Sequence, residues 1–262
     1  MIDTHCHIND EAYLAHQDEY ISEAQDAGVS TFLNVGFDLK SSRIAVEIAQ
    51  NHEYVYAAVG IHPSDVKKAG EHDFEEIEKL AKNKKVIAIG EIGLDYYWDK
   101  DPEVRNYQKE MFIKQIEIAN KLNLPISIHC RDGLEDCLTI LKNHKVNRGG
   151  IMHCYAGSLE MASEFIKLGF LLGFGGTTTF KNAVRPKEVV ANIPSTAYVL
   201  ETDAPYLTPE PFRGHPNHSK YLCLVRNKIA ELRNTTIEQV EKETTENFKR
   251  VFDLWRQKLT EF

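Results

Sequence analysis

The sequence predicts an α/β fold, a closed (β/α)8 TIM barrel, for the whole chain of 262 residues. Eight short apolar runs recur along the chain, and segments with helical periodicity separate them. Most of these runs are continuous Val, Ile, Ala and Gly, as in parallel strands that are covered on both faces. Chains of about 250 residues commonly form one such barrel, so we expect a single domain over 1–262. A doubly wound open sheet is the competing architecture.

The expected strands are spaced so that a helix fits between each pair, which implies parallel pairing with right-handed crossovers. In chain order they cover 1–8, 31–37, 55–61, 86–92, 126–130, 149–155, 170–180 and 197–202.

Helical periodicity is clearest from Pro102 to Leu122, where Phe112 and Ile116 belong to an apolar stripe and Asn123 lies at the exit. Segment 204–218 is rich in Pro and should be a long loop after the eighth strand, a place where function is common. The other expected helices cover 17–27, 41–51, 73–82, 134–143, 159–168 and two segments within 219–260.

Charge and cysteine usage limit the class of protein. The formal net charge of −8 disfavours broad neutralisation of phosphates, so a phosphate substrate would need local positive charge, which bound divalent cations can supply. The five cysteines are odd in number and form no Cys-x-x-Cys pair, which favours a reducing compartment. Polar residues interrupt the start of the chain, and no run reaches the ~18 apolar residues of a membrane span. We therefore expect a cytoplasmic protein with no membrane association.

Six potential metal ligands lie at or just past the ends of expected strands, where a barrel forms its active face. In a strand His5 and His7 point the same way, while Cys6 points to the other face. Any one of these residues alone is better explained as a buried histidine or a helix cap. The six residues are His5, His7, Glu91, His129, His153 and Asp203.

This donor set exceeds what one catalytic cation requires, since such sites usually keep three protein ligands and an open position. We therefore expect two divalent cations bridged by Glu91, with Mg²⁺, Mn²⁺ or Zn²⁺ as candidates. Cations about 3.5 to 4 Å apart lower the pKa of water and stabilise attacking and leaving oxygens together. Cys6, Cys130 and Cys154 each follow a histidine of this set, so strand alternation predicts that they turn outward and pack against helices.

Motifs along nearly the whole chain resemble the TatD-like metal-dependent deoxyribonucleases, within the wider amidohydrolase-type barrels. The matching stretches are DTHCHI at 3–8, VGIHP at 59–63, GEIGLDYY at 90–97, PISIHCRD at 125–132, HCYAG at 153–157, TFKNA at 179–183 and ETDAPYLTPEPFRG at 201–214.

The resemblance implies a metal-dependent hydrolase of phosphodiesters, commonly a 3′-to-5′ exonuclease, with a nucleic acid substrate such as the 3′ ends of single-stranded DNA. It implies that His5, His7, Glu91 and Asp203 hold one cation, and that Glu91, His129 and His153 hold the second. After Arg213-Gly214 the family pattern continues with a basic residue and Asn, whereas this chain has His215-Pro216-Asn217. One phosphate contact is therefore in doubt.

Roles for the surrounding residues follow from their positions after strand ends. Asp203 is expected to be the general base, and His62 to contact substrate or protonate the leaving oxygen. Tyr96 is a candidate for stacking on a base. Candidates for phosphate contacts are Arg131, Lys181, Arg213 and Asn217.

Two alternatives remain open from the sequence. An amidohydrolase or lactonase would use the same metals on a small amide or ester, in a compact apolar pocket without phosphate-binding arginines. A non-catalytic metal-binding barrel would keep the fold without the reaction.

Overall fold

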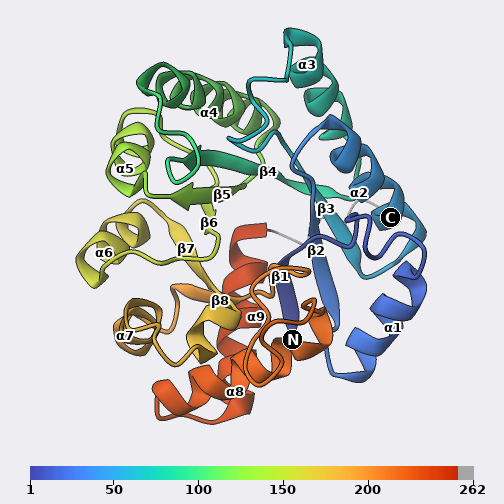
Figure 1. The fold of residues 1–262 in the computed structure, drawn as a ribbon, viewed down its shortest axis with the longest axis vertical. Helices are drawn as coiled ribbons and strands as arrows, with labels where there is room; N and C mark the ends of the chain where they lie inside the picture. The colour runs from blue at the N-terminus through green and yellow to red at the C-terminus, as the bar shows by residue number, and fades with distance from the viewer. Residues whose placement is uncertain (253–262) are drawn as a thin grey trace.

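The computed structural model describes residues 1–252 and shows eight parallel strands in the order β1 to β8, each beside the next strand of the chain (Figure 1). Helices alternate with the strands and surround them, so the TIM-barrel prediction is confirmed. The strands are β1 (Ile2–Cys6), β2 (Thr31–Val35), β3 (Val55–Val59), β4 (Val86–Asp95), β5 (Ile126–Arg131), β6 (Gly150–Met152), β7 (Phe170–Phe174) and β8 (Tyr198–Leu200).

The sheet curves round until β8 meets β1, which distinguishes it from an open doubly wound sheet. The hydroxyl of Thr4 donates to the Leu200 carbonyl at 2.9 Å. Just past the strand ends, the Asp203 N–H donates to the His5 carbonyl and the His7 N–H to the Ala204 carbonyl, both at 2.9 Å. These bonds bring His5, His7 and Asp203 to one place.

Capping residues mark both ends of helix α4 (Pro102–Leu122). In α4 the Asp101 side chain accepts from the Glu103 N–H, Pro102 occupies the first turn, and Asn123 ends the helix in the left-handed region at φ 54°. The helices are α1 (Gln17–Asp26), α2 (Leu39–Asn51), α3 (Glu71–Leu80), α4 (Pro102–Leu122), α5 (Leu134–Asn143), α6 (Leu159–Lys167), α7 (Arg185–Asn192), α8 (Leu222–Leu232) and α9 (Ile237–Phe252).

Several expected boundaries were wrong. The strand expected over 170–180 ends at Phe174, and a 3-10 helix, η1 (Gly176–Thr179), follows it. Helix α7 was not predicted, because it is short and contains two adjacent β-branched valines, although Pro186 in its first turn is a helix-start signal. Strand β4 continues to Asp95, whereas β6 ends at Met152, before His153.

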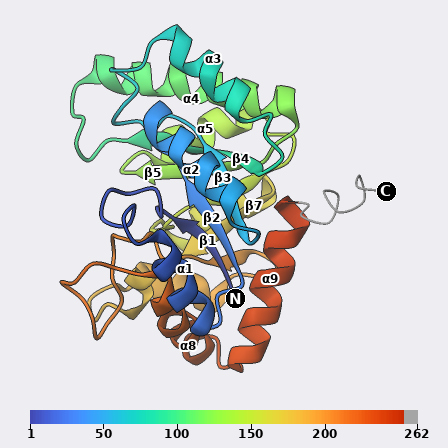
Figure 2. The same cartoon turned by 90° about the vertical axis from the view of Figure 1, so that its right-hand side faces the viewer.

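Helix α9 closes the end of the barrel where the strands begin. Its Phe248, Val251 and Phe252 pack with Ile2, Leu33 and other apolar side chains inside the barrel. Figure 2 shows α9 on the side opposite the loop 204–218 that follows β8. The chain beyond 252, including part of the helix expected to reach 260 and of the expected domain, lies outside the described residues.

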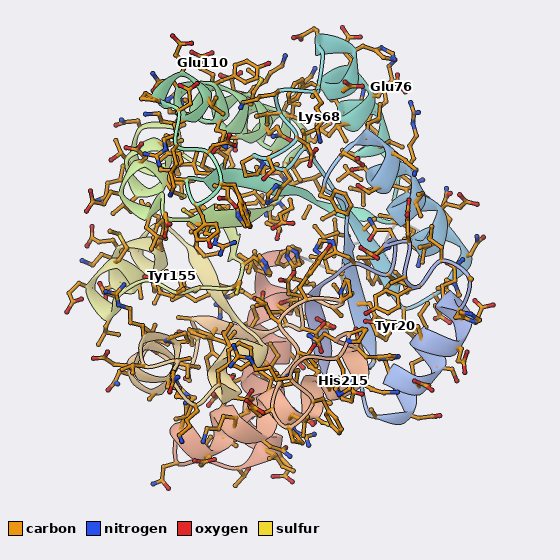
Figure 3. All side chains as sticks on the ribbon, in the orientation of Figure 1. Tyr20, Lys68, Glu76, Glu110, Tyr155 and His215 are labelled. Carbon is orange, nitrogen blue, oxygen red and sulfur yellow. The ribbon has the colours of Figure 1, made fainter. Side chains whose placement is uncertain are left out.

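The loop 204–218 begins beside the end of β1, where the Ala204 carbonyl accepts the His7 N–H, and it continues into a short 3-10 helix, η2 (Ser219–Tyr221), which packs on α1. Tyr20 of α1 and His215 of the loop lie in the same lower part of the view in Figure 3. Along residues 1–252, no helix combines the length and apolarity needed to cross a membrane.

Candidate metal centre

All six predicted ligands converge at the carboxyl ends of the strands, although they come from five different strands or the residues just after them. As the alternation predicted, the rings of His5 and His7 meet, with 3.3 Å between their Nε2 atoms, while Cys6 is buried in the outer core. Glu91 lies within β4, His129 within β5, and His153 and Asp203 follow β6 and β8.

Four atoms form a compact first donor set: Nε2 of His5, Nε2 of His7, Oε2 of Glu91 and Oδ1 of Asp203. Five of the six distances between them range from 3.3 to 3.9 Å. Ligands about 2.1 Å from a tetrahedral cation lie about 3.4 Å from one another. The spacing of these donors therefore fits one divalent cation.

The other oxygen of Glu91 faces a second donor set. Its Oε1 lies 3.1 Å from His129 Nδ1, 3.9 Å from His153 Nε2 and 4.0 Å from His62 Nε2. Asp203 Oδ1 lies 3.6 Å from His153 Nε2 and so stands between the two sets. One carboxylate with an oxygen in each set is the arrangement expected of a bridging ligand.

The histidine rings are fixed from behind. His7 Nδ1 donates to the Val35 carbonyl at 2.8 Å, and His5 Nδ1 lies 3.3 Å from the Ser127 hydroxyl. Each ring thus presents Nε2 to the first donor set. Such partners behind a ligand fix its tautomer and orientation.

Two carboxylates that the sequence reasoning missed serve the second set. Asp95 Oδ2 lies 3.0 Å from His129 Nε2, and Glu201 Oε1 lies 3.2 Å from His153 Nδ1. A signal was present: Asp95 shares a strand face with Glu91, and Glu201 precedes Asp203 by two residues. The expected end of the fourth strand at 92 hid the first of these relations.

Glu201 is fully buried, and its Oε2 has no hydrogen-bond partner among the described residues. Gly173 makes room for this carboxylate, because a Cβ there would lie 2.1 Å from Glu201 Oε2. Buried polar atoms are normally paired, so this oxygen indicates negative charge that a bound cation would help to balance.

Burial would raise the pKa of both central carboxyl groups, but the surrounding histidines outweigh it. The charge of His5 and the hydrogen bond of His129 hold the pKa of Glu91 well below its usual value. The charge of His153 and the His7 hydrogen bond likewise lower the pKa of Asp203. Both carboxylates are therefore ionised at neutral pH.

The histidines of the second set respond to the same carboxylates. Burial lowers the pKa of His153, but Glu201 and Asp203 outweigh it and raise that pKa to about 10. Burial also opposes the protonation of His129, yet Asp95 and Glu91 raise its pKa to about 9. Without a cation, protons on these rings balance the negative charge. Two divalent cations would balance the four carboxylates, so the donor set fits the predicted pair.

His62 lies beside the second set but differs from its ligands. Its Nδ1 accepts the Ser64 N–H at 3.1 Å, which places the ring proton on Nε2, facing Glu91. Burial and the neighbouring charge of His129 lower the pKa of His62 to about 4. The ring is therefore a neutral hydrogen-bond donor at neutral pH.

Asn217 is placed differently from the expected phosphate contact. Its side chain is 1% exposed, and its amide donates to the carbonyls of Thr202 and Tyr206, each at 2.7 Å. Both amide protons are thus used within the loop that follows β8. The structure assigns Asn217 to holding this loop over the centre.

Tyr96 is likewise unavailable for stacking on a base. It is 6% exposed, packs in the outer core with Leu94, and donates its hydroxyl to Asp136 at 2.7 Å. Leu94 and Tyr96 are two residues apart, so the alternation of β4 turns both outward. The exposed aromatic residues of this segment are Tyr97 and Trp98 instead.

The three basic candidates, Arg131, Lys181 and Arg213, are all exposed. Arg131 ends β5, two residues beyond His129, and Arg213 stacks on Phe180 with 4.2 Å to the ring centroid. Arg213 also lines an open groove of about 550 Å³ that Phe180 and Tyr206 help to form.

The cysteine expectation holds in part. Cys130 packs against the outer core with Cys6. The thiol of Cys154, however, lies within 4.8 Å of donor atoms of His153 and Glu201, because β6 ends at Met152 and strand alternation no longer applies. Cys154 therefore lies beside Glu201, behind His153, and is not part of the core that packs against the helices.

A (β/α)8 barrel with histidine and carboxylate donors gathered at its mouth defines a metal-dependent hydrolase. Residues 2–253 match the family model described as TatD related DNase. The chain belongs to this family.

Relatives across the whole chain agree with this assignment. The chain is 47% identical to the metal-dependent hydrolase YabD of Bacillus subtilis, over 96% of this chain and 98% of that protein. It is 33% identical to the metal-dependent hydrolase YcfH of Escherichia coli, with 97% and 96% covered. The crystal structure of YjjV, a TatD homologue from Escherichia coli, superposes with a TM-score of 0.93 at 30% identity, covering 97% and 98%.

Proposed function

We propose that this protein is a metal-dependent nuclease that hydrolyses phosphodiester bonds, acting as a 3′-to-5′ exodeoxyribonuclease on single-stranded DNA ends. The observation that carries the proposal is Glu91, whose two oxygens face two separate sets of metal donors. Paired cations suit in-line displacement at phosphorus. The description of the family as related to DNases supports the same class of substrate.

His5, His7, Glu91 and Asp203 would hold one cation, and Glu91, His129 and His153 the other. When bound, divalent cations supply Lewis acidity and lower the pKa of water toward neutrality. The predominance of imidazole donors suits zinc and manganese, whereas magnesium prefers oxygen ligands.

Asp203 would accept a proton from the attacking water. Its Oδ1 lies 3.4 Å from His7 Nε2 and 3.6 Å from His153 Nε2, within reach of both donor sets, and its lowered pKa keeps it ionised. His62, with its proton on Nε2, would donate a hydrogen bond to a phosphate oxygen or to the leaving oxygen. Arg131, Lys181 and Arg213 would hold flanking phosphates, where arginine binds bidentately.

The open groove beside the centre carries positive charge, which favours a phosphodiester over an uncharged amide or lactone. It is formed by the loop after β8 and by Phe180, with Arg213 on its wall. An amidohydrolase or lactonase would instead require a compact apolar pocket.

The test uses metal-stripped protein resupplied with Mg²⁺, Mn²⁺ or Zn²⁺ and a single-stranded oligonucleotide labelled at its 5′ end. We expect products that shorten stepwise from the 3′ end, and no shortening with Asp203→Asn. Glu91→Ala should lose both cations together with activity. An oligonucleotide that stays intact with every metal, beside cleavage of amide or lactone substrates, would establish the amidohydrolase alternative.

A further inference from the structure

Two neighbouring aromatic side chains stand in solvent near the metal centre. Tyr97 is 43% exposed and Trp98 is 69% exposed, directly after the end of β4, the strand that carries Glu91. Their rings meet edge to face, with centroids 4.7 Å apart and an interplanar angle of 89°. Two large rings held together in water form a surface on which another flat group can stack.

Positive charge accompanies these rings. The Arg131 guanidinium lies 3.7 Å from the Tyr97 ring centroid and 5.7 Å from that of Trp98. The Lys100 ammonium lies 5.6 Å from the Tyr97 centroid. Aromatic faces combined with cations are the features by which proteins hold unpaired nucleotides, since bases stack on the rings and phosphates meet the charge.

The aromatic segment is rigidly held. Asp95 Oδ1 accepts the N–H groups of Tyr97 at 2.9 Å and Trp98 at 3.3 Å. The Tyr96 N–H donates to the Arg131 carbonyl at 2.8 Å, which ties this turn to the end of β5. Arg105 of α4 donates to the Tyr96 carbonyl from below at 3.1 Å. A surface fixed in this way loses little conformational entropy when a ligand binds.

The carboxylate of Asp95 connects this aromatic surface to the metal centre. Asp95 Oδ2 contacts His129 Nε2 at 3.0 Å, while Oδ1 holds the turn of Tyr97 and Trp98. Asp95 also pairs in register with Arg131, two residues along β5 from His129. Two residues of a strand span about 7 Å, so the aromatic surface lies next to the centre.

We propose that Tyr97, Trp98 and Arg131 form a stacking subsite for the unpaired bases of a nucleic acid strand whose backbone lies in the metal centre. The proposal rests on the proposed function and deepens it, because it names the residues that hold the unpaired bases next to the cleaved bond. Arg131, together with Lys100, whose ammonium also donates to the Tyr96 carbonyl at 2.9 Å, supplies positive charge for the phosphates of this segment. Double-stranded ends, whose bases are paired, cannot use the subsite.

The test compares wild type with Trp98→Ala and Tyr97→Ala on two substrates: a single-stranded oligonucleotide and methyl p-nitrophenyl phosphate, which has no nucleobase. Loss of a stacked base should raise the KM for the oligonucleotide about 10-fold or more. The fall in kcat/KM should be at least 10-fold larger for the oligonucleotide than for the ester. Trp98→Phe, which keeps a ring, should restore most of the oligonucleotide activity.

Tyr54→Ala is the matched control, because Tyr54 is 48% exposed but precedes β3 at the opposite end of the barrel. It should behave as wild type on both substrates. Abasic positions at the 3′ end of the oligonucleotide should reduce wild-type activity as much as Trp98→Ala reduces activity on the intact oligonucleotide. Combining the abasic substrate with Trp98→Ala should reduce activity no further than either change alone.

The outcomes separate the two proposals. If wild type cleaves the oligonucleotide, and Trp98→Ala and Tyr97→Ala are indistinguishable from Tyr54→Ala, the subsite is overturned and the proposed nuclease activity stands. Additive losses from the abasic positions and Trp98→Ala also overturn the subsite. A wild-type protein that cleaves neither substrate with any cation overturns the proposed function, and the subsite with it.

Discussion

Glu201 places a negative charge in a fully buried position and directs one oxygen at His153. This carboxylate acts through the histidine, because it orients the ring and raises the affinity of Nε2 for a positive charge. Asp95 does the same for His129 on the other side of Glu91. The second donor set is therefore supported by two carboxylates behind it, while the first relies on a carbonyl and a hydroxyl.

Glu201→Gln tests this support. The amide keeps the size of the side chain but loses the charge, so we expect the affinity for the second cation, and activity, to fall by about 10- to 100-fold. Calorimetric titration of the metal-free protein would show one of the two binding steps weakened. Glu243→Gln is the control, since Glu243 accepts from the Tyr198 hydroxyl away from the centre. Two unchanged binding steps would contradict the role assigned to Glu201.

Candidate metal ligands at strand ends could be predicted from the sequence, because their residue type and position are enough to identify them. Residues that act through a neighbouring side chain could not be predicted in this way. Backbone hydrogen bonds between the end of β1 and the residues that follow β8 hold His5, His7 and Asp203 close together. The expected strand ends already predicted this proximity. The partner of Asp95 is on another strand, and its contact depends on the register of β4 with β5. Which of three successive aromatic residues faces solvent depended on how far β4 extends.

At the scale of elements, the contact between β1, β8 and the start of η2 relies on one buried polar network. Asp3 of β1 accepts the hydroxyls of Thr202 and Ser219, each at 2.6 Å. Ser219 in turn shares its hydroxyl with Tyr20 of α1 at 2.7 Å. The network holds the loop 204–218 at both of its ends, next to the ligands on β1 and after β8.

Ser219→Ala should destabilise the protein by about 1 to 3 kcal/mol, because it leaves Asp3 and Tyr20 each short of one buried hydrogen bond. The midpoint of urea unfolding of the metal-free protein measures this. Ser163→Ala provides the comparison, since Ser163 is exposed on α6, and it should change stability by less than about 0.5 kcal/mol. Equal midpoints for both variants would show that the network contributes little.

His218, at the start of η2, gives this region a dependence on pH. Burial and the neighbouring Lys220 lower its pKa to about 4, while Glu23 opposes the shift, and the ring stacks on Tyr20 with 3.9 Å between centroids. The unfolded chain takes up a proton at about pH 6.5, before the folded protein does. The contribution of His218 to stability is therefore present above pH 6.5 and is lost as the pH falls toward 4.

We expect wild type to lose about 1 to 2 kcal/mol between pH 7.5 and pH 5 through this residue. His218→Phe keeps a ring on Tyr20 but has no titrating group, so its loss over the same interval should be smaller by that amount. Urea midpoints of both proteins at the two pH values give the comparison. Parallel losses would show that His218 does not carry the dependence.

The order of strands and helices was predictable because apolar runs and helical stripes are local properties of the sequence. Helix α4 agrees with its expected limits, since Pro102 and Asn123 mark its ends. Helix α7 has Pro186 in its first turn but no side-chain cap, and η1 has no side-chain cap either. Both elements pack against α8, and α7 also packs against α6. Tertiary contacts therefore decided the elements that local pattern could not.

For the whole molecule, the buried carboxylates of the centre make folding sensitive to cations. Adding Mn²⁺ or Zn²⁺ to the metal-free protein at 100 times its Kd should stabilise it by about 2.7 kcal/mol for each site that fills. For a chain of this size each filled site corresponds to a rise in Tm of about 5 to 10 °C. Glu91→Ala, which lacks the bridging ligand, should show most of this rise abolished in the same thermal scan. A wild-type Tm that no cation changes would contradict the assignment of the metal centre.

Helix α9 seals the barrel at the end opposite the donors, with Phe248, Val251 and Phe252 seated among the interior side chains (Figure 2). The mouth therefore has to serve as both entrance and exit. A long polymer therefore cannot pass through the barrel from one end to the other. Substrate would reach the donors from the mouth, and each product would leave by the same side.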